Sequence, residues 1–368
     1  MHHKKSVLIF ALACAFLTPM AYANTAIDTK NLDQLYQDAI NEGGKLVIYA
    51  GGDTAGQQDG FKNAFEKRFP KIKANIVVDY SKYHNARIDY QLSKGQVKAD
   101  LVMLQTLQDF PRWKKQGVLL NYKPAAWQHI YPAFRDKDGA YTGVFVDTFS
   151  NVVNTQQLTS TQIPTEMTDY LKPELKGKIV TTYPNDDDAV LFWFKLAVDK
   201  YGWDFVEKFK DQNGYFVRGT QAPADDVESG KAAATFSTDG MLTPAQGAQS
   251  KFVLPKSDPF VSWAQRAAIL KQAKHPAAAK LYLNWLLDKD TQQSVWYMWS
   301  ARTDVPTPKG YKAIWDYRNT DVNAFEKFMS DRATVEAFRQ KITLILGEVR
   351  GEPSTGNVGL MPTQALPH

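Results

Sequence analysis

Two apolar patterns alternate along the first third of the chain. Short apolar runs predict strands, and apolar residues at helical spacing predict helices. The expected elements are strands at 45–50, 74–78 and 99–104 and helices at 32–40, 61–69 and 86–92. Phe61, Phe65 and Phe69 form the apolar face of the second helix, which Pro70 ends. Because strands that alternate with helices usually pair in parallel, this part is expected to form an open α/β unit whose ligands bind at the carboxyl ends of its strands.

The same alternation begins again after Gly177, without any repeat of the sequence itself. The pattern there predicts strands at 178–182, 215–218 and 233–237 and helices at 189–201 and 224–229. The remainder reads as helical, with helices from Pro276 onward, at 291–299, at 322–329 and at 333–346, the last capped by Gly347. Residues 352–368 are rich in proline and glycine and are expected to be loose.

The amino-terminal residues have the three parts of a secretory signal peptide. Lys4 and Lys5 supply a positive region, residues 7–17 an apolar region, and Ala21 and Ala23 the small residues of a cleavage site before Asn24. The apolar run is too short to span a bilayer. Residues 1–23 are therefore expected to be removed, which places the mature protein in the periplasm.

Cysteine content and charge narrow the classes of protein. Cys14 is the only cysteine of the 368 residues and lies in the signal peptide, so disulfides and thiolate chemistry are excluded from the mature chain. Loss of Lys4 and Lys5 lowers the formal net charge from +5 to +3, which indicates neither nucleic acid nor a membrane surface as partner. The remaining residues, about 345, are enough for two folded units.

Sequence signatures of common enzymes are missing. The chain has no Gly-x-Ser-x-Gly elbow, Walker loop or His-Glu-x-x-His, and no Gly-x-Gly-x-x-Gly follows the first strand. His84, His129 and His275 are too scattered for their spacing to define a zinc site or a triad. We therefore expect a binding protein without catalytic residues. The rival class is a secreted hydrolase or lyase that uses Asp186–Asp188 with Asp53.

Six short segments carry a family resemblance when taken in order. They are 46–53 (LVIYAGGD), 98–102 (KADLV), 117–119 (GVL), 173–179 (PELKGKI), 274–280 (KHPAAAK) and 290–293 (DTQQ). Each segment is weak alone, but their order behind a signal peptide is specific. The chain resembles the bacterial periplasmic solute-binding proteins of ABC importers, in particular the branch for ferric iron and related small ligands.

The resemblance implies two α/β lobes with a cleft between them and a helical C-terminal third. Residues 24–148 and 266–368 would form the first lobe and residues 149–265 the second, joined by crossing segments at 144–153 and 262–269. Such receptors close about their hinges when a ligand contacts both lobes. The resemblance also implies a monomer that delivers its solute to an inner-membrane ABC permease. No cofactor is expected, apart from a metal ion carried as the ligand.

The loop at residues 183–188 is the most specific local feature. One of Asp186, Asp187 and Asp188 is expected to cap the following helix, because a carboxylate there accepts hydrogen bonds from free N–H groups. Three acids exceed what capping needs, so these acids and Tyr183 are candidate contacts for a metal or a cationic ligand. Related iron receptors bind an anion at this turn through small hydroxyl and glycine residues, and this chain has acids instead.

Two more acids follow predicted strands. Asp53, with Thr54 beside it, comes directly after the first strand, where some iron receptors carry a histidine ligand. Asp239 comes where iron receptors carry paired tyrosines, and the loss of both tyrosines argues against ferric binding of the usual kind. With Asp187 these two acids form the candidate metal set. The alternative for each is a turn-forming aspartate beside glycine.

Candidate contacts of other types complete the site prediction. Arg218 follows a strand, and its guanidinium suits a phosphate or carboxylate; Arg87 is a second such candidate, and a structural ion pair is the alternative for both. Trp263 lies at the return crossing, where its ring would stack on an organic cation. Trp193, between two phenylalanines, is expected in the core.

The expected position of the acids indicates the charge of the ligand. Because Asp53, Asp186–Asp188 and Asp239 all follow strands, they are expected to converge in the cleft. Convergent carboxylates favour a cation, either a metal such as iron or an organic cation beside Trp263. The runner-up is a receptor for a phosphorylated or carboxylated solute held by Arg218 and helix N-termini.

Overall fold

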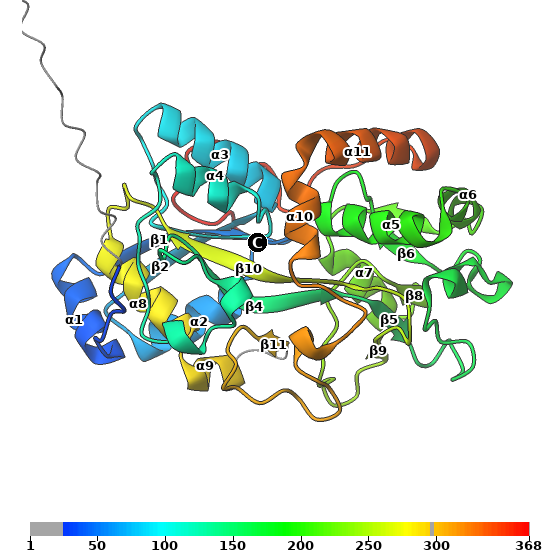
Figure 1. Cartoon of the computed structure of the whole chain (residues 1–368), viewed down its shortest axis with the longest axis horizontal. Coiled ribbons are helices and arrows are strands. Elements are labelled where there is room, and N and C mark those ends of the chain that lie inside the picture. The colour runs from blue at the N-terminus through cyan, green and yellow to red at the C-terminus, as the bar shows by residue number, and fades with distance from the viewer. Residues whose placement is uncertain (1–24, 295–297, 368) are drawn as a thin grey trace, which may run out of the picture.

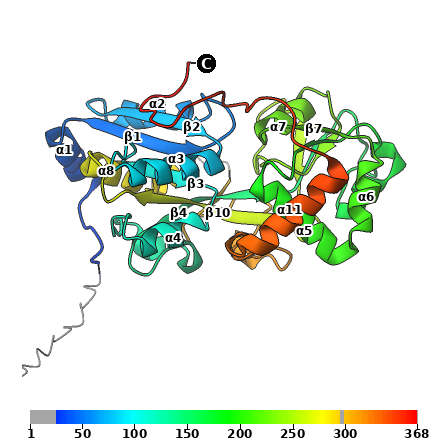
Figure 2. The ribbon, with the colours of Figure 1, turned by 90° about the horizontal axis from the view of Figure 1, so that it is seen from above.

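The computed structural model describes residues 25–294 and 298–367, so the predicted signal peptide and its cleavage site lie outside the described residues. The described chain forms two lobes, and long strands cross from one to the other (Figures 1 and 2). The crossing strands are β4 (Thr142–Phe149), which leads into β5 (Asn151–Asn154), and β10 (Val261–Ile269). β4 and β10 pair antiparallel along their length. Both lie where the sequence analysis expected crossing segments.

The sheet of the first lobe has the strand order β11-β4-β10-β3-β1-β2. Besides the crossing strands, its members are β1 (Lys45–Gly51), β2 (Lys73–Asp79), β3 (Leu101–Leu104) and β11 (Trp299–Ser300). β1 pairs in parallel with β2 and β3, as predicted. β10 and β11 add antiparallel pairs, so the sheet is mixed.

Helices cover the two faces of this sheet (Figure 2). They are α1 (Leu32–Asn41), α2 (Asp59–Arg68), α3 (Ser81–Ser93), α4 (Asp109–Lys115), α8 (Pro276–Leu286) and α9 (Lys289–Ser294). Leu46 and Ile48 of β1 enter one apolar core, and Val47 and Tyr49 enter another, because successive side chains of a strand point to opposite faces. In the first core Phe65 packs edge-on against Tyr282, with ring centroids 5.0 Å apart.

The second lobe has two small sheets. β6 (Val180–Thr182) pairs in parallel with β7 (Tyr215–Val217), and β5 lies between the antiparallel strands β8 (Ala234–Thr235) and β9 (Ser250–Val253). Its helices include α5 (Asp188–Tyr201), α6 (Asp204–Lys210) and α7 (Gln221–Glu228). Trp193 of α5 stacks on Phe236 with ring centroids 3.7 Å apart, which places this tryptophan in the core, as expected.

Two C-terminal helices, α10 (Ala324–Ser330) and α11 (Arg332–Leu346), pack on the second lobe. The ring of Phe192 in α5 lies 5.7 Å from that of Phe325 and 5.4 Å from that of Phe328. The assignment of all residues 266–368 to the first lobe is therefore wrong for residues 324–346. An amphipathic helix shows that it needs a partner, but its pattern does not show which lobe supplies the partner.

The segment after α11 returns to the first lobe (Figure 2). Gly347 ends the helix with a φ of 96°, a left-handed conformation that favours glycine. We call residues 348–362 the C-terminal strap. Its hydrogen bonds to the first lobe include Thr355 Oγ1 to Asp79 Oδ1 (2.7 Å), Arg87 Nε to Gly359 O (2.6 Å), Gln91 Nε2 to Leu360 O (2.7 Å) and Tyr49 Oη to Pro362 O (2.7 Å). The expectation of a loose tail is wrong, because polar side chains of the first lobe bind its backbone.

The helix predicted at 291–299 does not extend to Trp299. The structure describes α9 from Lys289 to Ser294, residues 295–297 lie outside the described residues, and Trp299 pairs with Val146 of β4 as part of β11. The indole of Trp299 donates to the carbonyl oxygen of Lys312 at 2.7 Å. Within the described ranges, no helix combines the length and the apolar content needed to cross a bilayer.

Candidate ligand-binding site

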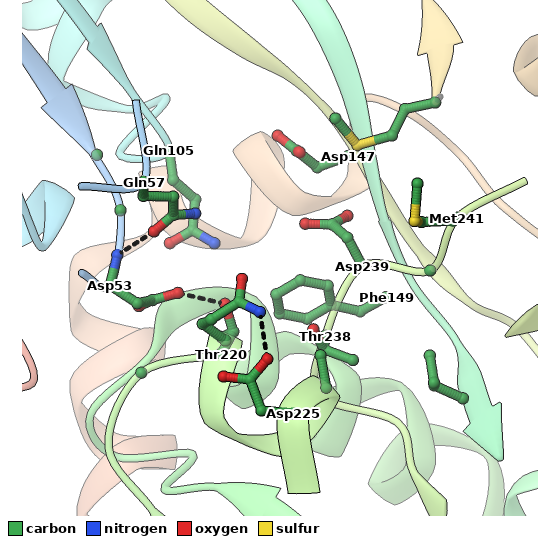
Figure 3. A pocket seen from close by; sticks show the side chains of 18 of the residues that line it. Asp53, Gln57, Gln105, Asp147, Phe149, Thr220, Asp225, Thr238, Asp239 and Met241 are labelled. Carbon is green, nitrogen blue, oxygen red and sulfur yellow. Dashed lines mark hydrogen bonds between the residues drawn. The ribbon is translucent and has the colours of Figure 1, made fainter. Parts of the chain in front are cut away.

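A cavity of about 760 Å³ lies between the lobes. The loop after β1, the start of α3 and the crossing strands form the walls on one side. The turn before α5, the start of α7 and residues 238–248 form the other side. Figure 3 looks into this cavity. It lies between the lobes, where the family resemblance placed the ligand.

Acidic and aromatic side chains dominate the lining. The acidic residues are Asp53, Asp147, Asp186, Asp187, Asp188, Asp225, Glu228 and Asp239. The aromatic residues are Phe61, Tyr80, Phe145, Phe149, Phe252 and Trp263. Lys82 is the one basic residue in the described part of the lining. A cleft lined by one sign of charge attracts a ligand of the opposite sign.

Asp53 connects the lobes at one wall (Figure 3). Its backbone N–H donates to Gln57, and its Oδ2 accepts a 2.7 Å hydrogen bond from Oγ1 of Thr220 in the second lobe. Burial raises the pKa of the Asp53 carboxyl, although the bond from Thr220 acts in the opposite direction. Thr54, predicted together with Asp53, is not part of the lining.

Asp187 is the cap of helix α5. Its Oδ1 accepts from the N–H groups of Ala189 and Val190 at 2.8 and 2.9 Å, so capping, expected of one of the three acids, falls to Asp187. Burial raises the pKa of Asp187 to about 7 even though the bond from Val190 lowers it. Its neighbour Asp188 accepts a 2.8 Å bond from Arg339 of α11. Both acids line the cavity, but the protein already supplies their partners.

Arg218 binds the acidic loop instead of facing the cavity. Its Nε and Nη2 donate to Oδ2 and Oδ1 of Asp186 at 2.8 and 3.1 Å, and Nη2 also donates to Oη of Tyr83 in the first lobe at 3.0 Å. Lys82 of the first lobe pairs with the same aspartate. Together these ion pairs hold the pKa of Asp186 below its usual range, against the effect of burial. Contrary to prediction, Arg218 does not line the cavity.

A second pair of acids, Asp147 and Asp239, lies at the crossing strands. Asp147 belongs to β4 and is 7% exposed. Asp239 lies beside it because its backbone bridges to Phe149 and its Oδ1 accepts a 2.8 Å bond from the N–H of Thr148. Burial raises the pKa of both groups, that of Asp239 to about 7, and the neighbouring charge of Asp239 raises the pKa of Asp147 further.

Glycine at position 240 makes this arrangement possible. A Cβ atom on Gly240 would lie 1.8 Å from the Phe252 ring, so any side chain there would push the segment away from β9. Asp239 was predicted as a site residue, whereas Asp147 was missed. A signal for Asp147 was present: it is an acid within the otherwise uncharged strand 142–149, where an ionised side chain is costly unless it has a partner or a function.

Trp263 lines the cavity from β10, as predicted. Its ring packs edge-on against Phe149 with centroids 5.0 Å apart, and its Nε1 donates to Oε1 of Gln265 at 3.2 Å. Because the side chain is only 2% exposed, it is a fixed wall of the cavity. Its orientation is set by the protein and does not depend on a ligand.

Two other candidates lie elsewhere. Tyr183 stacks on Phe216, with ring centroids 5.3 Å apart, and is not part of the cavity lining. Arg87 forms a buried ion pair with Asp79 at 2.6 Å and donates to the C-terminal strap. Arg87 therefore has the structural ion pair that was the alternative to a ligand contact.

The candidate metal set is not assembled as a metal site. Within residues 25–294 and 298–367, no group of three or more acidic, histidine or cysteine side chains has the geometry to hold a metal ion. Instead Asp53 accepts from Thr220, Asp187 caps α5 and Asp239 pairs with Asp147. Each predicted ligand has a different partner.

Comparison with known proteins identifies the family. A family model described as bacterial extracellular solute-binding protein matches residues 97–315. The chain belongs to this family. This solute-binding protein is 22% identical to an uncharacterised protein of Haemophilus influenzae over 271 residues, which are 70% of this chain and 77% of that protein.

Solved structures of periplasmic binding proteins share the two-lobe fold. A substrate-binding protein of an ABC transporter from Agrobacterium tumefaciens matches with a TM-score of 0.70 at 13% identity, covering 83% of this chain and 95% of the other. AfuA from Actinobacillus pleuropneumoniae, with fructose-6-phosphate bound, matches at 0.65 and 20% identity, covering 82% and 98%. Iron-bound HitA from Pseudomonas aeruginosa matches at 0.64 and 14% identity, covering 81% and 99%.

These findings define the general function of the chain. It is a bacterial extracellular solute-binding protein, and this family implies a periplasmic location in bacteria. The family and these structural neighbours are binding proteins, not enzymes. The neighbours carry a sugar phosphate in one case and iron in another, so the fold alone does not identify the ligand.

Proposed function

We propose that this solute-binding protein is the receptor for a small organic cation, which it holds between its lobes and presents to an ABC permease. The observation that carries the proposal is the charge of the cavity. Its described lining has eight carboxyl residues and one lysine, and that lysine is paired with Asp186. Such an excess of acid concentrates cations and repels anions.

The size and walls of the cavity favour an organic ligand. A volume of about 760 Å³ lies in the usual range for small-molecule sites, roughly 300–1,000 Å³. Phe149 and Trp263 supply aromatic surface beside the acids. Aromatic faces attract cations and also cover the methylene groups of an organic ligand.

A phosphorylated or carboxylated solute, the earlier alternative, lacks suitable partners here. Arg218 donates to Asp186 and Tyr83, and Lys82 is paired with the same aspartate. The N-terminus of α5, a natural anion site, already binds the Asp187 carboxylate. An anion in this cavity would therefore face carboxylates, and the basic side chains that could bind it are already paired with Asp186.

A transported metal ion is also less suited to this cavity. Ferric and other hard ions need several oxygen ligands at close range, and no such group converges among the described residues. The large, partly aromatic cavity would leave most of its surface without contact to a single ion. We therefore propose an organic cation, and not iron, as the ligand.

We further propose that the protein acts as a monomer and releases its ligand by opening the lobes at the permease. The bonds from Thr220 to Asp53 and from Lys82 to Asp186 support this mechanism, because each joins one lobe to the other across the cavity. A ligand that contacts both lobes stabilises their closed arrangement.

A thermal-shift screen of the purified mature protein tests this function. The panel contains alkylamines, diamines, guanidines, quaternary ammonium ions, sugar phosphates, dicarboxylates and ferric citrate. A ligand at one hundred times its dissociation constant adds about 2.7 kcal/mol to the stability. We expect organic cations to raise the melting temperature. Stabilisation by anions or metal ions alone would refute the proposal, and turnover of a ligand, lost in Asp187→Ala, would support the hydrolase or lyase alternative instead.

A further inference from the structure

We infer that Asp147 and Asp239 together bind the charged head of the ligand, and that this head is a protonated amine or guanidinium that carries N–H groups. The inference rests on the proposed function, since it specifies which organic cation the cavity accepts. It adds the recognition residues and the chemical class of the head group.

The pair lies where the two lobes meet. Both carboxyl groups come from segments at the crossing between the lobes, β4 for Asp147 and the bridge to Phe149 for Asp239. Figure 3 shows both groups pointing into the same space, with Phe149 and Met241 nearby. A head group bound here would contact the strands about which the lobes move.

Neither Asp147 nor Asp239 has a positively charged partner among the described residues. Unlike Asp186 and Asp188, neither member of the pair forms an ion pair with a lysine, arginine or histidine of the described chain. The donor to Asp239 is the N–H of Thr148, and the polar neighbour of Asp147 is Asp239 itself. Asp147 is nonetheless more than nine-tenths buried, and a buried carboxylate without a partner is costly. The ligand would supply that partner.

Hydrogen bonding favours a head group that carries N–H donors. Ionised carboxyl groups are acceptors only, so the pair is complementary to a head group with several N–H donors. A quaternary ammonium ion has the same charge but no donor, and it would leave the carboxyl oxygens that Thr148 does not bind without hydrogen bonds. Leaving buried acceptors unsatisfied costs about 1–3 kcal/mol, which is a discrimination of about fivefold to one hundred and fortyfold.

The charges around the pair give binding a defined pH dependence. Asp53 lies close enough to raise the pKa of Asp239 further, and on β10 the neighbouring Arg266 is occupied by Glu326. Gln265 and Trp263, which line the cavity from β10, carry no charge. The pair therefore retains a proton that a cationic head displaces to solvent. Affinity should rise with pH up to about 7 and fall about tenfold per pH unit below the pKa if one proton is exchanged.

The test uses matched probes on the mature protein. Each alkylamine or diamine of the panel is compared with its N-trimethyl analogue by calorimetry at pH 7.5. We expect the amine to bind at least about five times more tightly. Asp147→Asn and Asp239→Asn should each reduce the affinity about tenfold or more and remove most of its pH dependence. Asp225→Asn is the comparison within the cavity, because Asp225 lines the same cavity but accepts a hydrogen bond from Gln221, and it should reduce the affinity less than either substitution in the pair.

The outcomes separate this inference from the proposed function. If organic cations bind but quaternary ions equal the amines, or if Asp225→Asn weakens binding as much as Asp239→Asn, the assigned head-group site is wrong while the receptor for organic cations stands. If no organic cation binds, the proposed function fails as well. Melting curves of the two asparagine variants, which keep the side-chain shape, verify that each variant is folded.

Discussion

Arg218 and Asp186 form an ion pair with two hydrogen bonds, Nε to Oδ2 at 2.8 Å and Nη2 to Oδ1 at 3.1 Å. Both members also contact the first lobe, Arg218 through Tyr83 and Asp186 through Lys82. Arg218 donates in addition to the carbonyl oxygen of Gly351 in the C-terminal strap at 2.9 Å. A single ion pair thus fastens both lobes and the strap at one side of the cavity.

Removing this arginine should weaken ligand binding without removing a ligand contact. In Arg218→Ala the lobes lose a charge-assisted contact, so we expect ligand dissociation to accelerate and the affinity to fall about tenfold. Stopped-flow dissociation and calorimetry with a cation from the screen measure the effect. Arg68→Ala is the control, because Arg68 forms a surface pair with Asp33 away from the cavity. An unchanged dissociation rate in Arg218→Ala would show that the lobe contact does not hold the ligand in.

The second prediction concerns Asp187, the cap of helix α5. Asp187→Ala removes the acceptor of two helix N–H groups and should lower the free energy of unfolding by about 0.5–2 kcal/mol. Asp187→Asn keeps an acceptor and removes a partly buried charge whose pKa is raised to about 7, so it should be at least as stable as the wild type at pH 7.5. Urea denaturation compares the three proteins. Equal destabilisation by both substitutions would assign the role of Asp187 to its charge and not to capping.

The pair of Asp147 and Asp239 leads to a prediction of how stability depends on pH. Burial raises the pKa of Asp239 to about 7 and that of Asp147 well above its usual range, so the folded protein binds more protons than the unfolded chain between about pH 4 and pH 7. Stability should therefore fall as pH rises through this window and change little from this source above it. Asp239→Asn should make the free energy of unfolding depend less steeply on pH. The variant should be more stable than the wild type at pH 7.5, by about 1–3 kcal/mol.

Thermal melts at pH 4.5 and pH 7.5, without ligand, measure this difference. The advantage of Asp239→Asn should be largest at pH 7.5 and small at pH 4.5. A residual slope is expected, because Asp187 also has a raised pKa. An advantage that does not change with pH would mean that the substitution acts through packing and not through the buried charge.

The C-terminal strap can be tested by truncation. Deleting residues 351–368 removes the bonds from Tyr49, Arg87 and Gln91 and exposes the buried pair of Arg87 with Asp79. We expect a lower melting temperature by several degrees, since a few hydrogen bonds at about 1 kcal/mol each are lost. Deleting residues 364–368 leaves these bonds in place and serves as the control. Equal melting temperatures for both truncations would show that the strap adds no stability.

Sequence patterns predicted the parts of the fold that depend on local periodicity. The parallel pairing of β1 and the position of α5 follow from apolar runs and turn residues. The crossing strands were expected from the family resemblance. Capping at the acidic loop was also predicted from the local sequence. These features are set within a few residues of the chain, whereas the prediction of Trp263 as a site residue relied on the crossing segment that the family resemblance implies.

Features that depend on distant partners were not predictable in this way. Arg218 has the residue type of a ligand contact, and only the fold shows that Asp186 and Tyr83 occupy its donors. The packing of Phe328 against Phe192, and hence the lobe to which α10 belongs, depends on residues far apart in the sequence. Asp147 was overlooked because its pairing with Asp239 depends on a bridge between strand and loop.

The C-terminal strap also has a consequence for the order in which the protein folds. The bond from Tyr49 to Pro362 joins residues 313 positions apart, and that from Thr355 to Asp79 spans 276. During synthesis the first lobe emerges early, yet Asp79 and Arg87 receive their covering segment only when the last residues are made. Contacts of such long range form late, because closing the intervening chain costs entropy first. The first part of the polypeptide to appear is therefore among the last to be completed.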